Sequence, residues 1–155
     1  VSVDEQHGFL PGDLNEKMSP WTRPIFDILE KHFSVSQIES MLLENIIEIA
    51  PLAYMRGRTF EDCWIIADEM QNATKSQMKM LLTRIGNNTK MVVTGDLKQH
   101  DRGFSENGLS DFIKLVNAYE DHKLSHICIS KFDIQDVERH PAVIEILKIY
   151  GDEDD

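Results

Sequence analysis

The chain has 155 residues, of which 41% are hydrophobic and 28% are charged; this composition is typical of one folded globular domain and argues against a disordered chain. Its 16 basic and 27 acidic side chains give a formal net charge of −11, which argues against a protein that wraps duplex nucleic acid over its whole surface but leaves room for a local basic groove. No apolar run approaches the roughly 18 residues of a membrane span, so we expect a cytoplasmic protein with no membrane partner.

The first third of the chain shows helical spacing of its apolar residues. Ser19 and Pro20 are typical of an N-cap and a first helical residue, and the residues after them predict a helix that ends near His32. A second, short helix is expected after Ser36. The β-branched run at 46–49 then predicts a first strand.

Strands and helices alternate in the rest of the chain. The patterns predict strands at 63–67, 90–94 and 124–129, and helices at 74–85, 107–116 and 141–150. The run 63–67 is fully apolar, which predicts a strand buried on both faces. The expected fold is therefore α/β, with a mostly parallel sheet, flanking helices and right-handed crossovers. In such sheets, ligands bind at the carboxyl ends of the strands.

The strand at 63–67 is followed directly by two acids, Asp68 and Glu69. One carboxylate can hold Mg²⁺, which prefers oxygen ligands and takes one or two carboxylates together with phosphates. The second can polarise a water for attack on phosphorus. This order is that of a Walker B motif. The alternative is that the two acids cap the helix that follows near Thr74.

The strand at 90–94 also ends in polar residues. Gly95 allows a tight turn, Asp96 follows it, and Gln99 offers an amide that can orient a water or contact a terminal phosphate. Because neighbouring parallel strands end at the same edge of a sheet, we expect Asp68, Glu69 and Gln99 to converge on one ion-and-phosphate pocket.

Several short motifs, each weak alone, are specific in combination. They include GFLPG at 8–12, APLAYMRGRT at 50–59, DEMQN at 68–72, LTRIG at 82–86, VTGD at 93–96 and DVERH at 136–140. With these motifs, nearly all of the chain resembles the PhoH family, the phosphate-starvation-inducible P-loop ATPases. The core is also similar to the first motor domain of superfamily 1 helicases, which pair an Asp-Glu strand end with a Gly-Asp-x-x-Gln strand end.

The resemblance implies ATP binding and magnesium-dependent ATP hydrolysis on a P-loop NTPase core of the RecA or helicase type. Asp68 would hold Mg²⁺, Glu69 would activate the attacking water, and Gln99 would sense the γ-phosphate. It also implies a homo-oligomeric ring, such as a hexamer, in which an arginine of one subunit serves the next. The remaining implied nucleotide contacts are Arg56, Arg58, Arg84, Asp96 and Arg139.

Each of these arginines also has a structural alternative. Arg56 and Arg58 could belong to a surface loop, although that loop joins two expected strands and could reach the site. Arg84 could be a helix C-terminal charge that is favourable to the helix dipole. Arg139, which lies just before Pro141, could have a structural role.

One motif of P-loop proteins is absent. None of the eight glycines is followed by Lys-Ser or Lys-Thr, so the phosphate loop G-x-x-x-x-G-K-[ST] is missing. In the PhoH family that loop precedes the region covered here, and the chain begins with Val1. We therefore expect residues 1–150 to be the C-terminal part of a single PhoH-like domain, followed by an acidic tail at 151–155. The N-terminal strand and phosphate loop are then missing, and the chain alone is expected to be inactive.

Two other functions stay open at this stage. One is an RNA-binding, helicase-like module coupled to a nucleotide, but the net charge of −11 does not indicate RNA binding. The other is a catalytically incompetent fragment that only folds and assembles.

Overall fold

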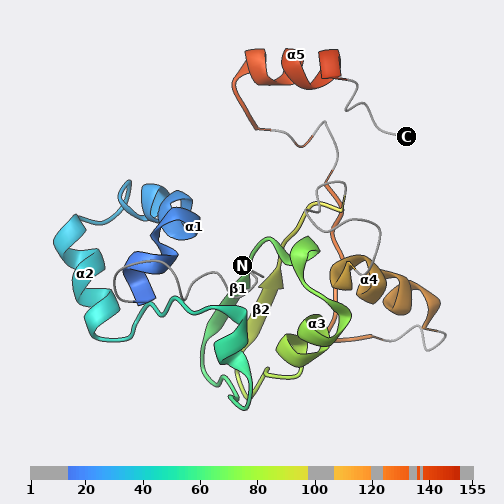
Figure 1. The fold of residues 1–155 in the computed structure, drawn as a ribbon, viewed down its shortest axis with the longest axis horizontal. Helices are drawn as coiled ribbons and strands as arrows, with labels where there is room; N and C mark the ends of the chain where they lie inside the picture. Colours follow the sequence, from blue (N-terminus) through green and yellow to red (C-terminus); the bar gives the residue numbers. More distant parts are fainter. Residues whose placement is uncertain (1–13, 98–106, 120–123, 133–135, 137, 151–155) are drawn as a thin grey trace. The chain divides into compact units, whose positions relative to one another are not determined.

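The computed structural model describes residues 14–97, 107–119, 124–132, 136 and 138–150 (Figure 1). Only the backbone is described at 14–21, 147, 148 and 150. The chain divides into two compact units, Val1–Ala118 and Tyr119–Asp155. Each unit is described by itself below.

Two helices open the described part of the first unit. Helix α1, Leu14–Leu29, begins five residues before Ser19, so the prediction that Ser19 is its N-cap is wrong. Leu, Glu, Lys and Met in the segment before Ser19 all favour a helix. Helix α2, Val35–Leu43, is confirmed: Ser34 and Gln37 form a capping box at its start, and Ile38 is buried.

The strand predicted at 46–49 does not form. Asn45 has a positive φ of 56°, and the backbone N–H groups of Ile46 and Ile47 both donate to the Met41 carbonyl, at 2.8 and 3.1 Å. These donors therefore complete the C-terminus of α2 and are not available for pairing in a sheet.

The sheet of the first unit is parallel, as predicted. Strand β1, Trp64–Ala67, pairs with strand β2, Lys90–Val93, and Ala67 lies opposite Val93 in the register. These two are the strands found in the described residues. Helix α3, Lys75–Leu82, lies between them in sequence. The unit is therefore a small α/β arrangement.

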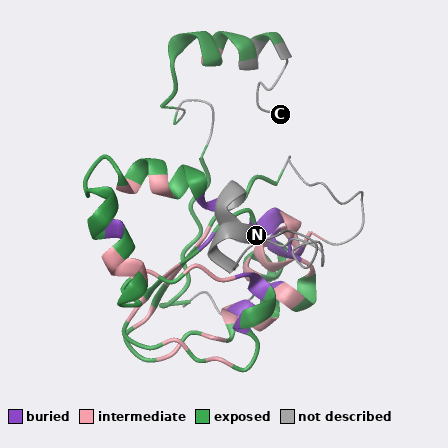
Figure 2. Ribbon diagram, turned by 60° about the vertical axis from the view of Figure 1, so that its left-hand side comes forward, coloured by how far each residue is buried: buried purple, intermediate pink, exposed green. Residues whose placement is uncertain are grey.

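One face of this sheet is covered by the hydrophobic core. The 3-10 helices η2, Leu52–Met55, and η3, Met70–Asn72, contribute to this core together with α3 and α4, Gly108–Ala118. Figure 2 shows buried residues, in purple, in these elements and also in α1 and α2. The buried members of the core are Leu52, Met55, Ala67, Met70, Ala73, Met78, Leu81 and Leu109.

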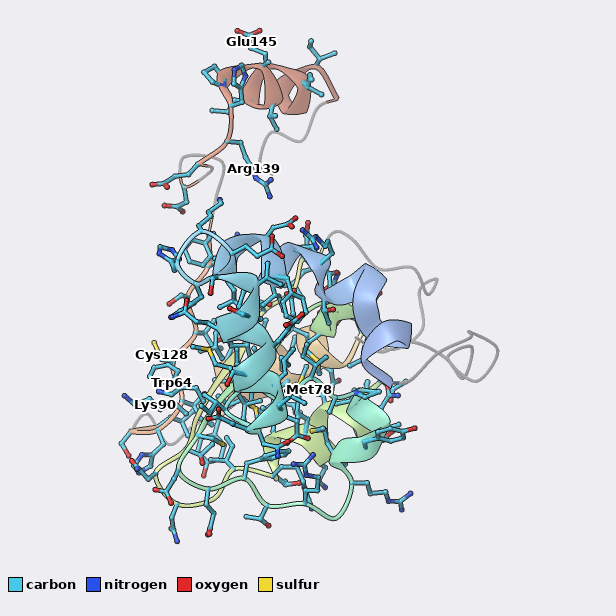
Figure 3. All side chains as sticks on the ribbon, turned by 90° about the vertical axis from the view of Figure 1, so that its left-hand side faces the viewer. Trp64, Met78, Lys90, Cys128, Arg139 and Glu145 are labelled. Carbon is cyan, nitrogen blue, oxygen red and sulfur yellow. The ribbon has the colours of Figure 1, made fainter. Side chains whose placement is uncertain are left out.

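The opposite face of the sheet is exposed. Trp64 is 69% exposed and Ile66 is 68% exposed, so the prediction of a strand buried on both faces is wrong. Among the described residues the core lies against only the side of the sheet that carries Ala67, Met91 and Val93. On the exposed face, the Lys90 ammonium lies 4.8 Å from the centre of the Trp64 ring (Figure 3).

Helix α3 is shorter than predicted. It begins after Thr74, which is its N-cap, and ends at Leu82 rather than at Ile85. Ile85 instead forms a parallel bridge with Phe60, and the Gly86 N–H donates to the Phe60 carbonyl at 2.7 Å. The segment after α3 therefore joins the start of the sheet instead of extending the helix.

Helices α3 and α4 touch at their amino ends. Asn107 caps α4 as predicted, because its side-chain oxygen accepts from the Ser110 N–H at 2.9 Å. The Gly108 N–H donates to the Ala73 carbonyl at 2.7 Å. A Cβ at Gly108 would lie only 2.5 Å from the Thr74 carbonyl oxygen, so only glycine allows this approach.

The second unit contains helix α5, Pro141–Tyr150, as predicted. The strand predicted at 124–129 is wrong: these residues are described without strand pairing and are all exposed. A β-branched composition favours a strand only where a partner strand supplies the ladder. In the described parts of both units, no helix is long and apolar enough to cross a membrane.

Candidate functional site

The ends of β1 and β2 are joined to each other by hydrogen bonds. The Thr94 N–H donates to the Ala67 carbonyl at 2.9 Å. The Thr94 hydroxyl donates to Asp68 Oδ1 at 2.5 Å. Asp68, the first acid of the Asp-Glu pair, is therefore held at the carboxyl edge of the sheet by the residue that directly follows β2.

Glu69 occupies a backbone conformation that is uncommon for its type. Its φ is 56° and its ψ is 35°, in the left-handed region, and η3 begins directly after it. The next N–H, that of Met70, donates to the Thr94 carbonyl at 3.0 Å. The turn after β1 is therefore fixed to the end of β2.

The two acids do not cap α3. That helix is capped by Thr74 and Gln77, whose side chains form a capping box. Asp68 and Glu69 are both exposed at the strand end, where charged groups can meet a ligand.

Gln71 was missed by sequence reasoning, and the structure places it between the two strand ends. It is 4% exposed. Its amide nitrogen donates to Glu69 Oε2 at 2.6 Å, and its amide oxygen accepts from the Asp96 N–H at 3.3 Å. The sequence places Gln71 only two residues after Glu69, which could have marked it as a site residue, but no sequence pattern indicates that it is buried.

Gly95 is required by this packing. A Cβ at this position would lie 2.7 Å from Gln71 Oε1 and 2.7 Å from Leu109 Cδ2, both well inside normal contact distance. Asp96, which follows, is exposed. Gln99 lies outside the described residues, so its convergence with Asp68 and Glu69 stays a prediction.

Arg58 and Arg84 lie at the edge of the sheet opposite to Asp68 and Glu69. The Arg84 guanidinium donates to the Met80 carbonyl at 3.1 Å and to the Arg58 carbonyl at 3.2 Å. The residue after Arg84, Ile85, bridges Phe60, which precedes β1. Since parallel strands start at one edge and end at the other, these arginines are at the amino edge.

Arg58 forms a local ion pair. Its guanidinium donates to both oxygens of Glu48, at 2.5 and 2.9 Å, and lies 4.5 Å from the centre of the Phe60 ring. These hydrogen bonds lower the pKa of the Glu48 carboxyl and raise the pKa of Arg58. Both side chains remain partly exposed, so the pair is of moderate strength.

The remaining predicted contacts are on the surface. Arg56 is exposed, in the turn that follows η2. Arg139 is exposed in the second unit, just before α5 (Figure 3). Its contact with a nucleotide stays a prediction.

The strand-end residues fit a magnesium ion in one respect. Asp68 and Thr94 place a carboxylate and a hydroxyl oxygen together at an exposed strand end. Among the described residues there is no cluster of three or more His, Cys, Asp or Glu side chains that could hold a metal. Mg²⁺ bound with nucleotides takes only one or two carboxylates and completes its ligands with phosphates and water, so this donor set suits it.

Comparison with known proteins identifies the family. A family model described as PhoH-like protein matches residues 1–151. A PhoH-like protein of Bacillus subtilis is 43% identical over 152 residues, which make up 97% of this chain and 46% of that protein. A PhoH-like protein of Mycobacterium tuberculosis is 43% identical over 152 residues, 97% of this chain and 42% of that protein.

The protein PhoH of Escherichia coli K12 is 42% identical over 155 residues, 97% of this chain and 42% of that protein. The chain therefore spans less than half the length of these relatives. Because the family model matches residues 1–151, and because relatives from three bacteria align over 97% of its length, the chain belongs to the PhoH family, as its motifs predicted.

Proposed function

We propose that the intact protein binds ATP on a P-loop NTPase core and hydrolyses it with Mg²⁺. One observation carries the proposal: two parallel strands end side by side, and Thr94, after β2, is hydrogen-bonded to Asp68 and Met70, the residues on either side of Glu69. In α/β folds, ligands bind at this edge of the sheet. Membership of the PhoH family supports the same function.

Asp68 and Thr94 are the residues that would hold the ion, directly or through water. When bound, Mg²⁺ would neutralise negative charge on the phosphates. The hydroxyl of Thr94 donates to Asp68 Oδ1, so the carboxylate is oriented before any ligand arrives. Asp96 and Gln99, which follow β2 in sequence, would contact the terminal phosphate.

Glu69 would act as the general base. Its carboxylate would take one proton from the attacking water while the water oxygen forms a bond to the γ-phosphorus. The bond from that phosphorus to the bridging oxygen then breaks, and the products are ADP and inorganic phosphate. The chain of 155 residues lacks a phosphate loop motif, so we expect it to be inactive alone.

The test is phosphate release by the full-length protein with Glu69→Gln. We expect the rate to fall about 10²- to 10⁴-fold, because general-base catalysis contributes roughly that much, while ATP binding persists. Glu61→Gln removes an exposed acid at the amino side of β1 and serves as the matched control. If Glu69→Gln turns over as fast as the parent, the assignment of the base is wrong.

The proposal extends to a homo-oligomeric ring in which an arginine acts on the neighbouring subunit's nucleotide. Arg56 is the candidate: within the described residues its side chain has no hydrogen bond or ion pair, whereas Arg58 and Arg84 are held by their own chain. An arginine finger is worth roughly 10³–10⁵ in rate.

Mixing two inactive full-length variants tests this arrangement. Subunits with Arg56→Ala and subunits with Glu69→Gln should regain activity when combined, because some interfaces then pair an intact base with an intact arginine. Arg84→Ala in place of Arg56→Ala is the control and should reduce stability instead. No recovery at any mixing ratio would reject Arg56 as the residue that acts between subunits.

A further inference from the structure

We propose that Gln71 is a positioning residue that aims the Glu69 carboxylate and links it to the segment after β2. This inference rests on the proposed function, in which Glu69 is the base. Gln71 and Thr22 are the buried polar residues of the described chain, and Gln71 is 4% exposed. A buried amide needs partners for both of its ends, so the partners show what this side chain holds in place.

The partners fix the orientation of the amide. The nitrogen end donates to Glu69 Oε2 at 2.6 Å, and the oxygen end accepts from the Asp96 N–H at 3.3 Å. A carboxylate can only accept and a backbone N–H can only donate, so turning the amide over would break both contacts. One buried side chain therefore joins the proposed base to the segment that follows β2.

The side chain is also confined on its other sides. Met70 and Ala73, on either side of the Gln71–Asn72 segment, are each 1% exposed. Gly95 approaches so closely that a Cβ there would lie 2.7 Å from Gln71 Oε1 and 3.0 Å from the Gln71 backbone nitrogen. Burial of the side chain and the close approach of Gly95 therefore limit its movement, so packing supports the hydrogen bond to Glu69.

This arrangement has a direct consequence for the base. Gln71 engages one of the two carboxylate oxygens of Glu69, Oε2, and leaves Oε1 to accept the proton. The backbone of Glu69 is itself held in the left-handed region. A general base must point at its water within a fraction of an ångström, and a small misplacement costs about 10²-fold in rate. A movement at Asp96 would reach Glu69 through the same amide.

The experiment uses the full-length protein and steady-state ATP hydrolysis. Gln71→Met keeps the length of the side chain but removes both hydrogen bonds. We expect kcat to fall about 10- to 100-fold, while KM for ATP changes less than about threefold because the phosphates are held elsewhere. Gln77→Met is the matched control: Gln77 lies in the first turn of helix α3, and its amide oxygen accepts from the Thr74 N–H at 2.9 Å. It should lower stability and leave kcat unchanged.

A second variant gives a readout that a structural role would not move. Gln71→Glu keeps the length of the side chain but replaces the donor to Glu69 Oε2 with a second carboxylate, so attraction becomes repulsion. We therefore expect kcat to fall further than in Gln71→Met, while KM for ATP again changes little. A merely structural loss would lower the amount of folded enzyme and leave kcat per folded molecule unchanged.

The outcomes separate this inference from the proposed function. Parental kcat in both Gln71 variants, with the folded fraction of each protein measured by circular dichroism, would overturn the positioning role. In a Glu69→Gln background, Gln71→Met should cause no further loss, because the two residues act as one unit; additive losses would contradict the inference. If Glu69→Gln itself retains parental activity, the assignment of the base fails first and the role of Gln71 fails with it.

Discussion

At the scale of single residues, Glu69 shows how the turn after β1 is held. A glutamate with a φ of 56° carries roughly 1–3 kcal/mol of backbone strain. The Met70 N–H bond to the Thr94 carbonyl and the Gln71 bond to the carboxylate offset that cost. Such a conformation persists only when its surroundings determine it, and here the surroundings are the end of β2 and a buried amide.

The Arg58–Glu48 pair gives a pH prediction. Glu48 has a pKa below its ordinary value of 4.5, chiefly through the hydrogen bonds from Arg58. A lowered pKa in the folded state means that the pair stabilises the fold above about pH 4.5 and that this contribution disappears as the pH falls through the lowered pKa. We expect Glu48→Gln to cost about 0.5 kcal/mol at pH 7, since the pair is partly exposed.

Urea denaturation of parent and Glu48→Gln at pH 7 and pH 3 measures the difference. The free energies of unfolding should differ at pH 7, and the difference should shrink at pH 3, because the pair loses its contribution as the pH falls through the lowered pKa of Glu48. Glu39→Gln, in an exposed position of α2, should show no such dependence. An equal difference at both pH values would show that the ion pair is not the cause.

At the scale of elements, the capping box at the start of α3 is the feature to test. The Gln77 N–H donates to Thr74 Oγ1 at 3.3 Å, and the Thr74 N–H donates to Gln77 Oε1 at 2.9 Å. Thr74→Ala removes the side-chain acceptor, so we expect a loss of about 1 kcal/mol in the free energy of unfolding. Thr74→Ser keeps the hydroxyl and should keep most of the stability. Chemical denaturation compares the three proteins, and equal stability of the Ala and Ser variants would contradict the role of the cap.

The same caps explain which elements could be predicted from the sequence. Thr74, Asn107 and Pro141 each lie within one residue of a helix start, so a short segment carries the whole signal. The runs at 46–49 and 124–129 were predicted as strands and are not. Their β-branched residues suit a pleated surface, but a strand also needs a partner, and the partner is a matter of tertiary structure.

The candidate site likewise contains residues that a local sequence pattern predicts and residues that depend on tertiary structure. Asp68 and Glu69 could be predicted because an apolar strand and two acids are adjacent in the sequence. Gln71 could not, because its role depends on Gly95 and Asp96, which come near it only when β1 and β2 pair. In the same way, the position of Arg84 at the amino edge of the sheet follows from the Phe60–Ile85 bridge. No local sequence pattern predicts that bridge.

At the scale of the whole molecule, the net charge opposes self-association, whereas the exposed face of the sheet favours it. The chain carries a formal charge of −11, which keeps copies apart at low salt. The exposed face of Trp64, Ile66 and Val92, which are 69%, 68% and 42% exposed, favours association once salt screens that charge. We therefore expect the 155-residue chain to self-associate more strongly as the salt concentration rises.

Sedimentation velocity at several salt concentrations measures this effect. Ile66→Lys places a charge in the middle of the apolar face and should keep the chain monomeric. Leu43→Lys makes the same change in net charge at another exposed apolar residue, on α2, and should associate like the parent. A parent chain that stays monomeric at every salt and protein concentration would show that the face does not drive association.

The contact between Gly108 and the Thr74 carbonyl joins helix α4 to the segment that follows β1. The closest approach of the two helices is at the amino end of α4, directly beside the segment that carries Gln71. Helix α4 has 11 residues and spans about 16 Å, so its backbone runs from this contact beside the strand ends to Ala118, the last residue of the first compact unit.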